Sequence, residues 1–549
     1  MEADYIIAGG GLTGCALASR LKQRNPSLDI LVIEAGEDAS NQPDTQTFPG
    51  LFSLLDSPLD WTYKTEAQPN TCDRTHVVHA GKAVGGGSTI NFGGWSRGDA
   101  ADYDDWAKIV GDDRWSYNGL LPYFRRSESF NSQDSHNHGS DGPVKITSVS
   151  ASDPNRKYPL REPIRQAWDE IGVPFNSDGC SGSSYGVCEF LETWNQGKRQ
   201  ASQQAYSLDG VKLITNMIVH RVKFDDTSPG EPRRASAVIL ANGERIKARK
   251  EVILAAGSIR TPQILMLSGI GPANELFKYD IPQVIDMPEV GKNLNDHFAV
   301  YQLYKLRNHE RGLALGSPAL SDPAFVKGLP TDWATNQDVP ADKLEAAMRK
   351  DYIRFGKSHP SLLKPGRPLV ESMIIYAPAG VPDVPMNGSL VVSSVMLLGS
   401  TSRGSVTIGS ASPNDPPKIL SNYFDTEVDR VTLIHGARRT MEALLDTNAL
   451  ADYIETEVPP PGMSVLTSES SDEEFEARIR ATGMAHHHSA GTAAMGKVVD
   501  SDLRVFGVGN VRVVDASILP LSIGGHPQAT LYAIAEQAAD IILGAESST

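Results

Sequence analysis

The segment that decides the fold lies at the start of the chain and reads Asp4-Tyr5-Ile6-Ile7-Ala8-Gly9-Gly10-Gly11-Leu12-Thr13-Gly14. An apolar run typical of a buried strand leads into glycines at G-x-G-x-x-G spacing, and small residues then favour a helix from Cys15 to Leu21. A side chain at Gly9 or Gly11 would block the turn or a bound pyrophosphate, and the following helix start attracts phosphate charge. The pattern therefore predicts a strand, a phosphate-binding turn and a helix.

A second strand and an acidic residue follow at the distance expected of a dinucleotide-binding unit. The strand is predicted over residues 29–33 and ends on Glu34, twenty residues past Gly14. A carboxylate at that position can bind the two hydroxyls of a ribose. Glycine-rich strand–helix turns with other functions share part of this pattern, so the interpretation depends on the rest of the chain.

Three further segments have the same character. The glycine cluster over residues 81–91 offers backbone that can pack against a flat ligand without interference from side chains. Residues 251–262 read as a buried strand that enters a small-residue turn, and residues 510–517 as a strand that ends on Asp515. Long stretches without such motifs separate these segments, which indicates one domain assembled from distant pieces.

Two histidines near the carboxyl terminus are suited to proton transfer. His488 begins the run His488-Ser489-Ala490-Gly491-Thr492-Ala493-Ala494-Met495-Gly496, and His526 follows 38 positions after it. An imidazole has an unperturbed pKa of about 6.5, so it can remove a hydroxyl proton near neutral pH. The chain thus combines a dinucleotide motif at one end with candidate bases at the other.

Together these segments resemble the glucose-methanol-choline (GMC) family of flavin oxidoreductases, and the resemblance spans essentially the whole chain. Residues 81–104 resemble the first signature of that family, and residues 257–271 resemble the second. The segments Gly291-Lys292-Asn293-Leu294-Asn295-Asp296-His297 and Ser402-Arg403-Gly404 are also similar to pieces of the family pattern.

The resemblance implies an α/β fold with a Rossmann-like FAD-binding domain, assembled from discontinuous segments, and an α+β substrate-binding domain built on a sheet. Residues 1–150, 205–300 and 480–549 are assigned to the FAD-binding domain, and residues 151–204 and 301–479 to the substrate-binding domain. A chain of 549 residues exceeds what one core usually supports. In the substrate-binding part, residues 389–398 and 404–408 predict strands, and residues 429–445 predict a helix.

The resemblance also implies FAD as the cofactor and a set of residues that hold it. The glycine turn would lie at the pyrophosphate, Glu34 at the adenosine ribose, and the backbone of Val219 at the adenine. Asn91 and neighbouring glycines would face the isoalloxazine, Asp515 would approach the ribityl phosphate, and Pro527 the pyrimidine end. The implied cofactor-binding residues are Gly9, Gly11, Leu12, Thr13, Gly14, Glu34, Ala35, Val84, Gly86, Ser88, Asn91, Phe92, Gly93, Gly94, Val219, Ala256, Asp515, Ala516, Pro527 and Gln528.

The resemblance assigns catalysis to His488 and His526. His488 matches the catalytic histidine of the family, and His526 matches a second position that is His or Asn in relatives. A carbinol carbon can give hydride to flavin N5 only as its hydroxyl proton leaves, so a base beside N5 is required. His488 would take the proton while His526 hydrogen-bonds the same oxygen. The implied partners are a small-molecule alcohol and either dioxygen or another electron acceptor.

The sequence departs from the family pattern at two places. Relatives usually carry an aromatic residue before the catalytic histidine, whereas this chain has His487, so we expect a more polar pocket wall that handles aromatic substrates differently. Relatives with covalently attached flavin carry a histidine where this chain has Ile90, so we expect non-covalent FAD. Consecutive imidazoles such as His486, His487 and His488 do not easily converge on one ion, so no metal site is predicted.

Three functional readings remain open at this stage. The first is an FAD-dependent alcohol oxidase or dehydrogenase, which the resemblance favours. The second is a hydroxynitrile lyase, because such lyases share the fold and both histidines while using FAD structurally. The third is a flavin-binding protein without catalysis, which the presence of both His488 and His526 disfavours.

Composition narrows the classes of partner. A formal net charge of −16 and the lack of basic runs argue against a nucleic-acid partner. The sequence has no stretch of eighteen apolar residues, so no membrane span is predicted. The start of the chain suggests a cytoplasmic protein, or one from which a secretion leader has been removed. A monomer or a homodimer is expected, and the four cysteines leave a bridge between Cys180 and Cys188 open.

Overall fold

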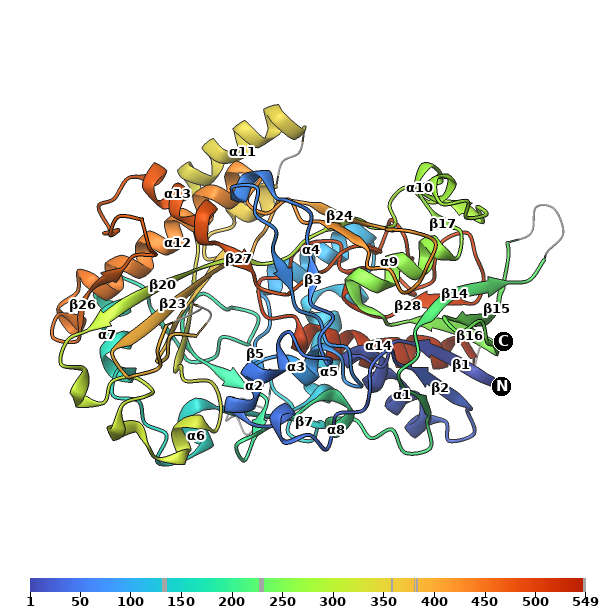
Figure 1. Cartoon of the computed structure of the whole chain (residues 1–549), viewed down its shortest axis with the longest axis horizontal. Coiled ribbons are helices and arrows are strands. Elements are labelled where there is room, and N and C mark those ends of the chain that lie inside the picture. Colours follow the sequence, from blue (N-terminus) through green and yellow to red (C-terminus); the bar gives the residue numbers. More distant parts are fainter. Residues whose placement is uncertain (131–135, 227–231, 357–358, 380, 382–383, 547–549) are drawn as a thin grey trace.

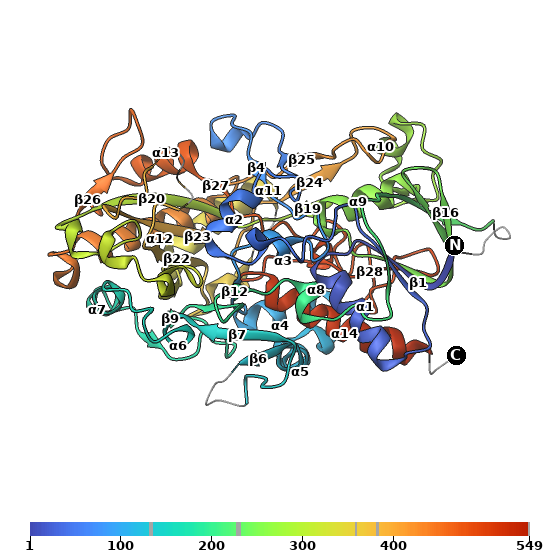
Figure 2. The same cartoon turned by 60° about the horizontal axis from the view of Figure 1, so that its bottom comes forward.

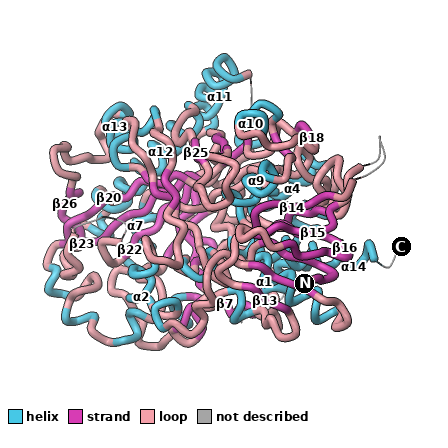
Figure 3. Tube along the Cα trace, turned by 45° about the vertical axis from the view of Figure 1, so that its right-hand side comes forward, coloured by secondary structure: helices cyan, strands magenta, loops and turns pink. Residues whose placement is uncertain are grey.

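Two large sheets form the body of the molecule and lie toward opposite ends of its long axis (Figures 1 and 2). The computed structural model describes residues 1–130, 136–226, 232–356, 359–379, 381 and 384–546. Both chain termini lie at the end that holds the first sheet, on the right of Figure 1. The strands of the two sheets form separate groups in the view of Figure 3.

The first sheet aligns the carboxyl ends of five strands that pair in parallel. Its order is β13-β2-β1-β16-β15-β14, and β28 also pairs with β16. In register, Ala8 lies beside Ile33 and Leu254, and Leu254 lies beside Val513. The strands are β1 (Glu2–Ala8), β2 (Ile30–Ile33), β13 (Lys212–Ile214), β14 (Val219–Phe224), β15 (Ala235–Leu240), β16 (Arg245–Leu254) and β28 (Val511–Val513). The residues that follow the five parallel-paired strands therefore meet at one edge of the sheet, where ligands of open α/β sheets bind.

Helices from both ends of the chain cover this sheet. Helix α1 (Leu12–Arg24) contacts α14 (Gln528–Glu546), which in turn contacts α5 (Tyr117–Ser127), and α9 (Gly257–Leu267) contacts β14. The buried face of α1 consists of small and apolar residues, which allow the helix to lie close to the sheet. The carboxyl-terminal helix is thus part of the same core as the first strand.

The second sheet has the order β26-β20-β23-β22-β21-β9-β8, and β27 pairs with β20. Helix α12 (Glu427–Leu445) packs on β22 and β23, and α11 (Ala341–Phe355) packs on α12. The strands are β8 (Phe175–Asn176), β9 (Gly186–Glu189), β20 (Phe298–Leu306), β21 (Trp333–Gln337), β22 (Val370–Ile375), β23 (Leu390–Leu397), β26 (Ile454–Val458) and β27 (Met484–Ala485). The strand predicted over 389–398 and the helix predicted over 429–445 are confirmed.

Shorter elements connect the two sheets. The strand predicted over 404–408 is β24, which pairs with β19 and β25 in a small sheet. The remaining strands are β3 (Tyr63–Lys64), β4 (Val77–Val78), β5 (Gly94–Trp95), β6 (Glu128–Phe130), β7 (Val144–Ser148), β10 (Leu191–Glu192), β11 (Trp194–Asn195), β12 (Lys198–Arg199), β17 (Ile270–Gly271), β18 (Ile285–Asp286), β19 (Lys292–Leu294), β24 (Gly404–Thr407) and β25 (Lys418–Leu420). The remaining α-helices are α2 (Phe48–Leu54), α3 (Gly87–Ile90), α4 (Ala100–Val110), α6 (Val149–Ser152), α7 (Arg161–Glu170), α8 (Ser202–Ala205), α10 (Ala273–Lys278) and α13 (Asp472–Thr482).

The predicted fold class is confirmed, while the predicted domain boundaries stay a prediction. Strand β27 lies in a segment assigned to the FAD-binding domain, yet it pairs with β20 of the second sheet. Strand β5 of the first assigned segment likewise pairs with β10 of the 151–204 segment. The histidine run that follows β27 therefore starts from the edge of the second sheet.

Two further sequence questions are answered by the structure. Cys180 and Cys188 are both free thiols in the interior, so the possible bridge between them is not formed. Within the described ranges, no helix combines the length and the apolar character needed to cross a bilayer.

Candidate active site

A cavity of about 570 Å³ extends from the glycine turn of the first sheet to the histidine run beside the second sheet. Its lining includes the turn at Gly9 and Gly11, Glu34 after β2, the loop over 86–94, and His488 and His526. These segments come from both ends and the middle of the chain. The cavity therefore brings the two groups of motifs that were recognised separately in the sequence into one site.

The end of the cavity at the first sheet is built for a dinucleotide phosphate. Leu12 and Thr13 in the first turn of α1 line the cavity, and the first amide groups of a helix lack partners within the helix. Glu34 accepts hydrogen bonds from the amides of Gly10 (2.8 Å) and Gly36 (2.9 Å), which fixes its carboxylate. Burial raises the pKa of Glu34 to about 7 although these amides oppose the shift. The lone pairs that remain can accept hydrogen bonds from ribose hydroxyls.

The glycines of this region leave room for a large flat group, as the implied FAD requires. Gly9 has φ +110°, and a Cβ there would lie 2.3 Å from the carbonyl oxygen of Ala255, so no other residue fits. A Cβ on Gly11 would meet only ordinary contacts at 3.8 Å, and one on Gly87 would meet no protein atom within 4 Å. Because both glycines line the cavity, their backbone is open to a ligand. The residues present therefore fit FAD.

A buried arginine holds the loop that closes one side of the cavity. Arg199 donates to the carbonyl oxygens of Thr45, Ser88, Thr89 and Asn91, and in the described part of the chain no acid pairs with it. Burial lowers the pKa of Arg199 to about 9. The Asn91 side chain donates to Gln528 at 2.9 Å, which joins the loop to the start of α14.

The structure places nearly all predicted cofactor-binding residues on the cavity lining, and their role in binding stays a prediction. Two of them lie elsewhere. Gly14 packs closely against the turn, since a Cβ at this position would lie 2.1 Å from the carbonyl oxygen of Gly9. Val84 is fully buried in the protein interior. Both residues contribute to packing within the protein rather than to the cavity surface. The carboxylate of Asp515 is also occupied, since it accepts hydrogen bonds from Gly257, Thr261 and Ser517.

The hydrogen bonds around His488 fix the position of its proton. His297 Nε2 lies 3.0 Å from the carbonyl oxygen of Ile523, which can only accept, so this nitrogen carries a proton. Burial lowers the pKa of His297 to about 4, so its other nitrogen, Nδ1, is a bare acceptor at neutral pH. His488 Nδ1 lies 2.9 Å from that acceptor and must be the donor. The remaining nitrogen of a neutral His488, Nε2, therefore has a free lone pair.

His488 is also held neutral and in place. Burial lowers its pKa well below 6.5, and the neighbouring imidazoles add to the effect. Its backbone amide donates to Asp296 Oδ1 at 2.7 Å, and Tyr423 donates to the other oxygen of that carboxylate. Within the residues that the structure describes, no group hydrogen-bonds Nε2, and the side chain lines the cavity. His488 thus presents an unprotonated nitrogen to the cavity.

His526 has the opposite electrostatic environment. Its ring lies 5.1 Å from that of His488, and its Nε2 lies 2.9 Å from Glu371 Oε1. Burial alone would lower the pKa of His526, but the charge and hydrogen bond of Glu371 raise it above its usual value. The protonated form of His526 is therefore favoured, and Nδ1 is the ring atom left to meet a ligand. The surroundings of these two neighbouring imidazoles thus favour different protonation states.

His486 and His487 of the histidine run lie in different surroundings. The His486 ring lies 4.9 Å from that of His488 and 5.9 Å from that of His526, so it belongs to the reacting end of the cavity. His487 adopts φ +62°, which turns its ring toward His79, 4.7 Å away. His486, rather than the His487 that the sequence singled out, is therefore the polar wall residue nearest the catalytic pair.

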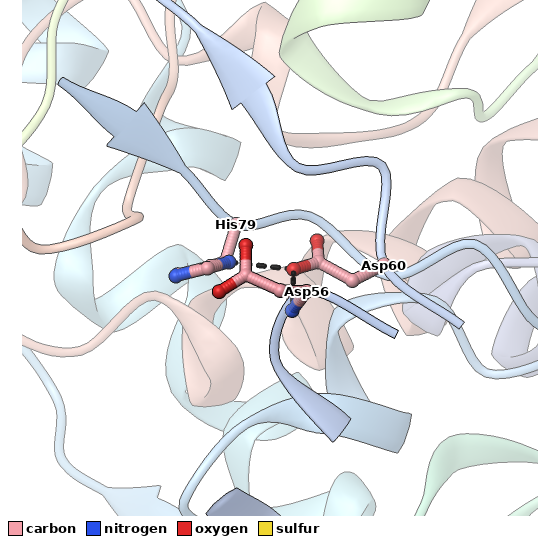
Figure 4. A group of neighbouring side chains, drawn as sticks. All are labelled: Asp56, Asp60 and His79. Carbon is pink, nitrogen blue, oxygen red and sulfur yellow. Dashed lines mark hydrogen bonds and ion pairs between the residues drawn. The ribbon is translucent and has the colours of Figure 1, made fainter. Parts of the chain in front are cut away.

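Near His487, Asp56, Asp60 and His79 form a cluster of potential metal ligands within 4.8 Å of one another (Figure 4). Asp60 already accepts hydrogen bonds from His79 Nδ1 at 2.5 Å and from the amides of Asp56, Thr62 and Ala80. Burial would raise the pKa of Asp60, but these bonds lower it to about 2. The hydrogen bonds of the Asp60 carboxylate thus fix the turn and orient His79, which is a structural role.

The sequence reasoning missed several residues of the site. His297 and Asp296 were recognised only as part of a family motif, and Tyr301 and Glu371 were not recognised at all. One sequence feature could have indicated Glu371, because it is the single acid within the apolar run of residues 369–375. An acid in a buried strand needs a partner, but the sequence does not show that the partner is His526, 155 positions away.

Comparison with known proteins gives matches over nearly the whole chain. The model of the family described as GMC oxidoreductase matches residues 3–299, and its carboxyl-terminal counterpart matches residues 400–535. The chain is 39% identical over 546 residues to the GMC-type oxidoreductase acuG of Aspergillus aculeatus, covering 98% of this chain and 99% of the relative. It is 33% identical over 573 residues to an oxygen-dependent choline dehydrogenase of Escherichia coli O157:H7, covering 100% and 95%. A formate oxidase of Aspergillus oryzae, in a structure concerned with its FAD modification, superimposes with a TM-score of 0.88 at 27% identity, covering 100% and 99%.

Proposed function

This chain belongs to the GMC oxidoreductase family and is an FAD-dependent oxidoreductase of CH–OH donors, in which we propose that His488 is the general base and His526 the hydrogen-bonding partner of the alcohol oxygen. When bound, FAD supplies the hydride acceptor. The product is an aldehyde or a ketone, and the electrons pass on to dioxygen or another acceptor.

The observation that carries this proposal is the fixed proton position of His488. Because His297 accepts from His488 Nδ1, the lone pair of Nε2 is available in the cavity before any substrate binds. Its pKa, which burial holds well below 6.5, keeps the base unprotonated over the physiological range. General-base assistance of this kind is typically worth ~10² to 10⁴ in rate.

His526 complements the base through its charge. The alcohol oxygen gains negative charge as its proton moves to His488, and a protonated imidazole stabilises that charge. Glu371 favours the protonated form of His526 and hydrogen-bonds Nε2, which leaves Nδ1 to contact the substrate oxygen. A neutral base and a cationic donor 5.1 Å apart, measured between ring centroids, suit the two ends of one proton transfer.

The cavity residues that would hold the cofactor are those already described: the glycine turn and Leu12, Glu34 after β2, and the loop that ends at Gly94. Ile90 lines the cavity in place of a nucleophilic histidine, so we propose non-covalent FAD.

The test is anaerobic mixing of the FAD-loaded protein with aliphatic, aryl, polyol and heteroaromatic alcohols while flavin absorbance is followed. Bleaching by an alcohol, reversed on admission of an electron acceptor, is the expected result. Absence of bleaching by every alcohol, together with cyanide release from mandelonitrile, would instead establish the lyase reading. A His488→Asn variant that binds FAD equally well controls for reduction at other sites.

A further inference from the structure

A third imidazole, that of His486, lies beside the catalytic pair and has no role in the reaction as described so far. Its backbone amide donates to the carbonyl oxygen of His297 at 2.9 Å, which anchors the residue next to the base. Its ring lines the cavity within 4.9 Å of the His488 ring, measured between centroids. A ligand that reaches His488 and His526 therefore also contacts His486.

The hydrogen-bonding capacity of His486 is only partly used by the protein. Burial lowers its pKa well below 6.5, so the ring is neutral and has one donor and one acceptor nitrogen. Nε2 lies 3.4 Å from the Tyr301 hydroxyl, and no other described residue bonds either ring nitrogen. Since buried polar groups are normally hydrogen-bonded, Nδ1 is the place where a ligand group is expected.

The wall beyond the histidines changes from polar to apolar along one strand. Glu371, Met373 and Ile375 alternate along β22, so their side chains share one face of the sheet. Glu371 meets His526 at the reacting end, while Met373 and Ile375 line the cavity farther along. Ser394 of β23 pairs with Tyr301 of β20 on one side and with Met373 of β22 on the other. An apolar body therefore fits beside a polar reacting group.

Apart from the pair of His526 and Glu371, the described lining residues place no charged group at this end of the cavity. Among the described lining residues the carboxylates are Glu34 and Asp515, and both belong to the cofactor segments. Glu371 is 2% exposed and is engaged with His526. A cationic substrate would find no free carboxylate there and would meet the protonated imidazole that Glu371 favours at His526. A flat uncharged ring finds good contacts with aromatic side chains and methionines, including Phe190, Tyr301 and Met484.

We propose that the substrate is an uncharged alcohol carried on a flat apolar ring, and that a second hydrogen-bonding group on this ring pairs with Nδ1 of His486. The inference rests on the proposed function and adds the class of substrate to it. His486 with Tyr301 then acts as the specificity determinant, and cationic alcohols such as choline are excluded. The chain would thus differ in substrate class from the choline dehydrogenase to which it is similar.

The experiment compares benzyl alcohol, its three hydroxybenzyl isomers and choline in anaerobic stopped-flow reduction of the FAD-loaded wild type and His486→Phe. At least one hydroxybenzyl isomer should exceed benzyl alcohol about tenfold in reduction rate divided by Kd, as one good hydrogen bond allows. His486→Phe should abolish that preference while still being reduced by benzyl alcohol. His487→Phe, whose ring packs against His79, should keep the preference.

Binding of cresols and toluene, which lack a carbinol, is measured in parallel from the perturbation of the flavin spectrum. The wild type should bind one cresol more tightly than toluene, and His486→Phe should not. Reduction by choline, equal use of benzyl alcohol and all hydroxybenzyl isomers, or an equal loss of preference in His487→Phe would overturn the inference. If no alcohol reduces the flavin but the cresol preference depends on His486, the proposed function fails while the recognition by His486 stands.

Discussion

At the scale of single residues, the site assigns different protonation states to two neighbouring histidines. His488 is neutral because it is buried and donates to His297, whereas His526 faces a carboxylate and favours the cationic form. Neither partner could be deduced from the motifs that contain the two histidines. The chemistry depends on side chains brought in by the second sheet and by the loop before it.

Removal of the Glu371 charge should change the pH dependence of the reaction. Glu371→Gln keeps a hydrogen-bond acceptor but loses the charge that raises the pKa of His526. Because protonated His526 is the active form and its pKa falls in the variant, the alkaline limb of kcat/KM should move to lower pH. The measurement is a pH profile of both proteins at equal FAD content. An unmoved alkaline limb would show that His526 does not act as a cation.

The residue at position 90 is the basis of our proposal that the flavin is not covalently attached. Ile90 has no nucleophilic atom, so acid precipitation of the holoprotein should release all of the yellow colour into the supernatant. Absorbance of the two fractions is the measurement. Flavin that stays with the washed pellet would contradict non-covalent binding and would require another attachment residue.

At the scale of elements, the carboxyl-end edge of the first sheet explains why most of the residues predicted to bind the cofactor line one cavity. The strand, glycine turn and Glu34 are close in sequence, so their spacing alone indicates a dinucleotide site. The helices and strands with clear periodicity were also predicted correctly, as for α12 and β23.

The rest of the site could not be predicted because it depends on pairings between distant elements. Contact of Glu371 with His526 needs the position of β22, and contact of His297 with His488 needs the loop between β19 and β20 to meet the loop after β27. Gly14 has the spacing of the motif but lies off the cavity lining, and its lack of a side chain serves packing against Gly9.

Two glycines of the same turn should fail in different ways when they are replaced by alanine. Gly9→Ala places a Cβ against the Ala255 carbonyl at φ +110°, which should cost at least ~1 to 3 kcal/mol of stability. Gly11→Ala has room in the protein but extends into the cavity, so the apoprotein should keep its stability and lose FAD affinity. Thermal unfolding of the apoproteins and FAD titration measure both effects. Equal stability of the Gly9→Ala and wild-type apoproteins would contradict the strain argument.

At the scale of the whole molecule, segments from Ala8 to Leu531 meet at the cavity. The last helix packs on the first, and the histidine run connects the edge of the second sheet to the first. A cofactor bound there contacts segments that are far apart in sequence, so its binding should stabilise the whole fold rather than one loop.

FAD should therefore raise the melting temperature of the apoprotein. Binding at a free concentration of 100 times Kd contributes about 2.7 kcal/mol to the folded state. Riboflavin lacks the pyrophosphate and the adenosine, so it cannot use the glycine turn or Glu34 and should give a smaller shift. Scanning fluorimetry with both ligands is the measurement. Equal shifts at equal concentration would show that the predicted nucleotide end contributes nothing.

The account depends most directly on the claim that His488 removes the alcohol proton. The decisive measurement is the limiting rate of anaerobic flavin reduction by a saturating alcohol in the wild type and in His488→Asn with equal FAD content. If His488 is the base, the variant should bind FAD and substrate but should be reduced ~10² to 10⁴ times more slowly. Reduction of His488→Asn at the wild-type rate would contradict the central claim.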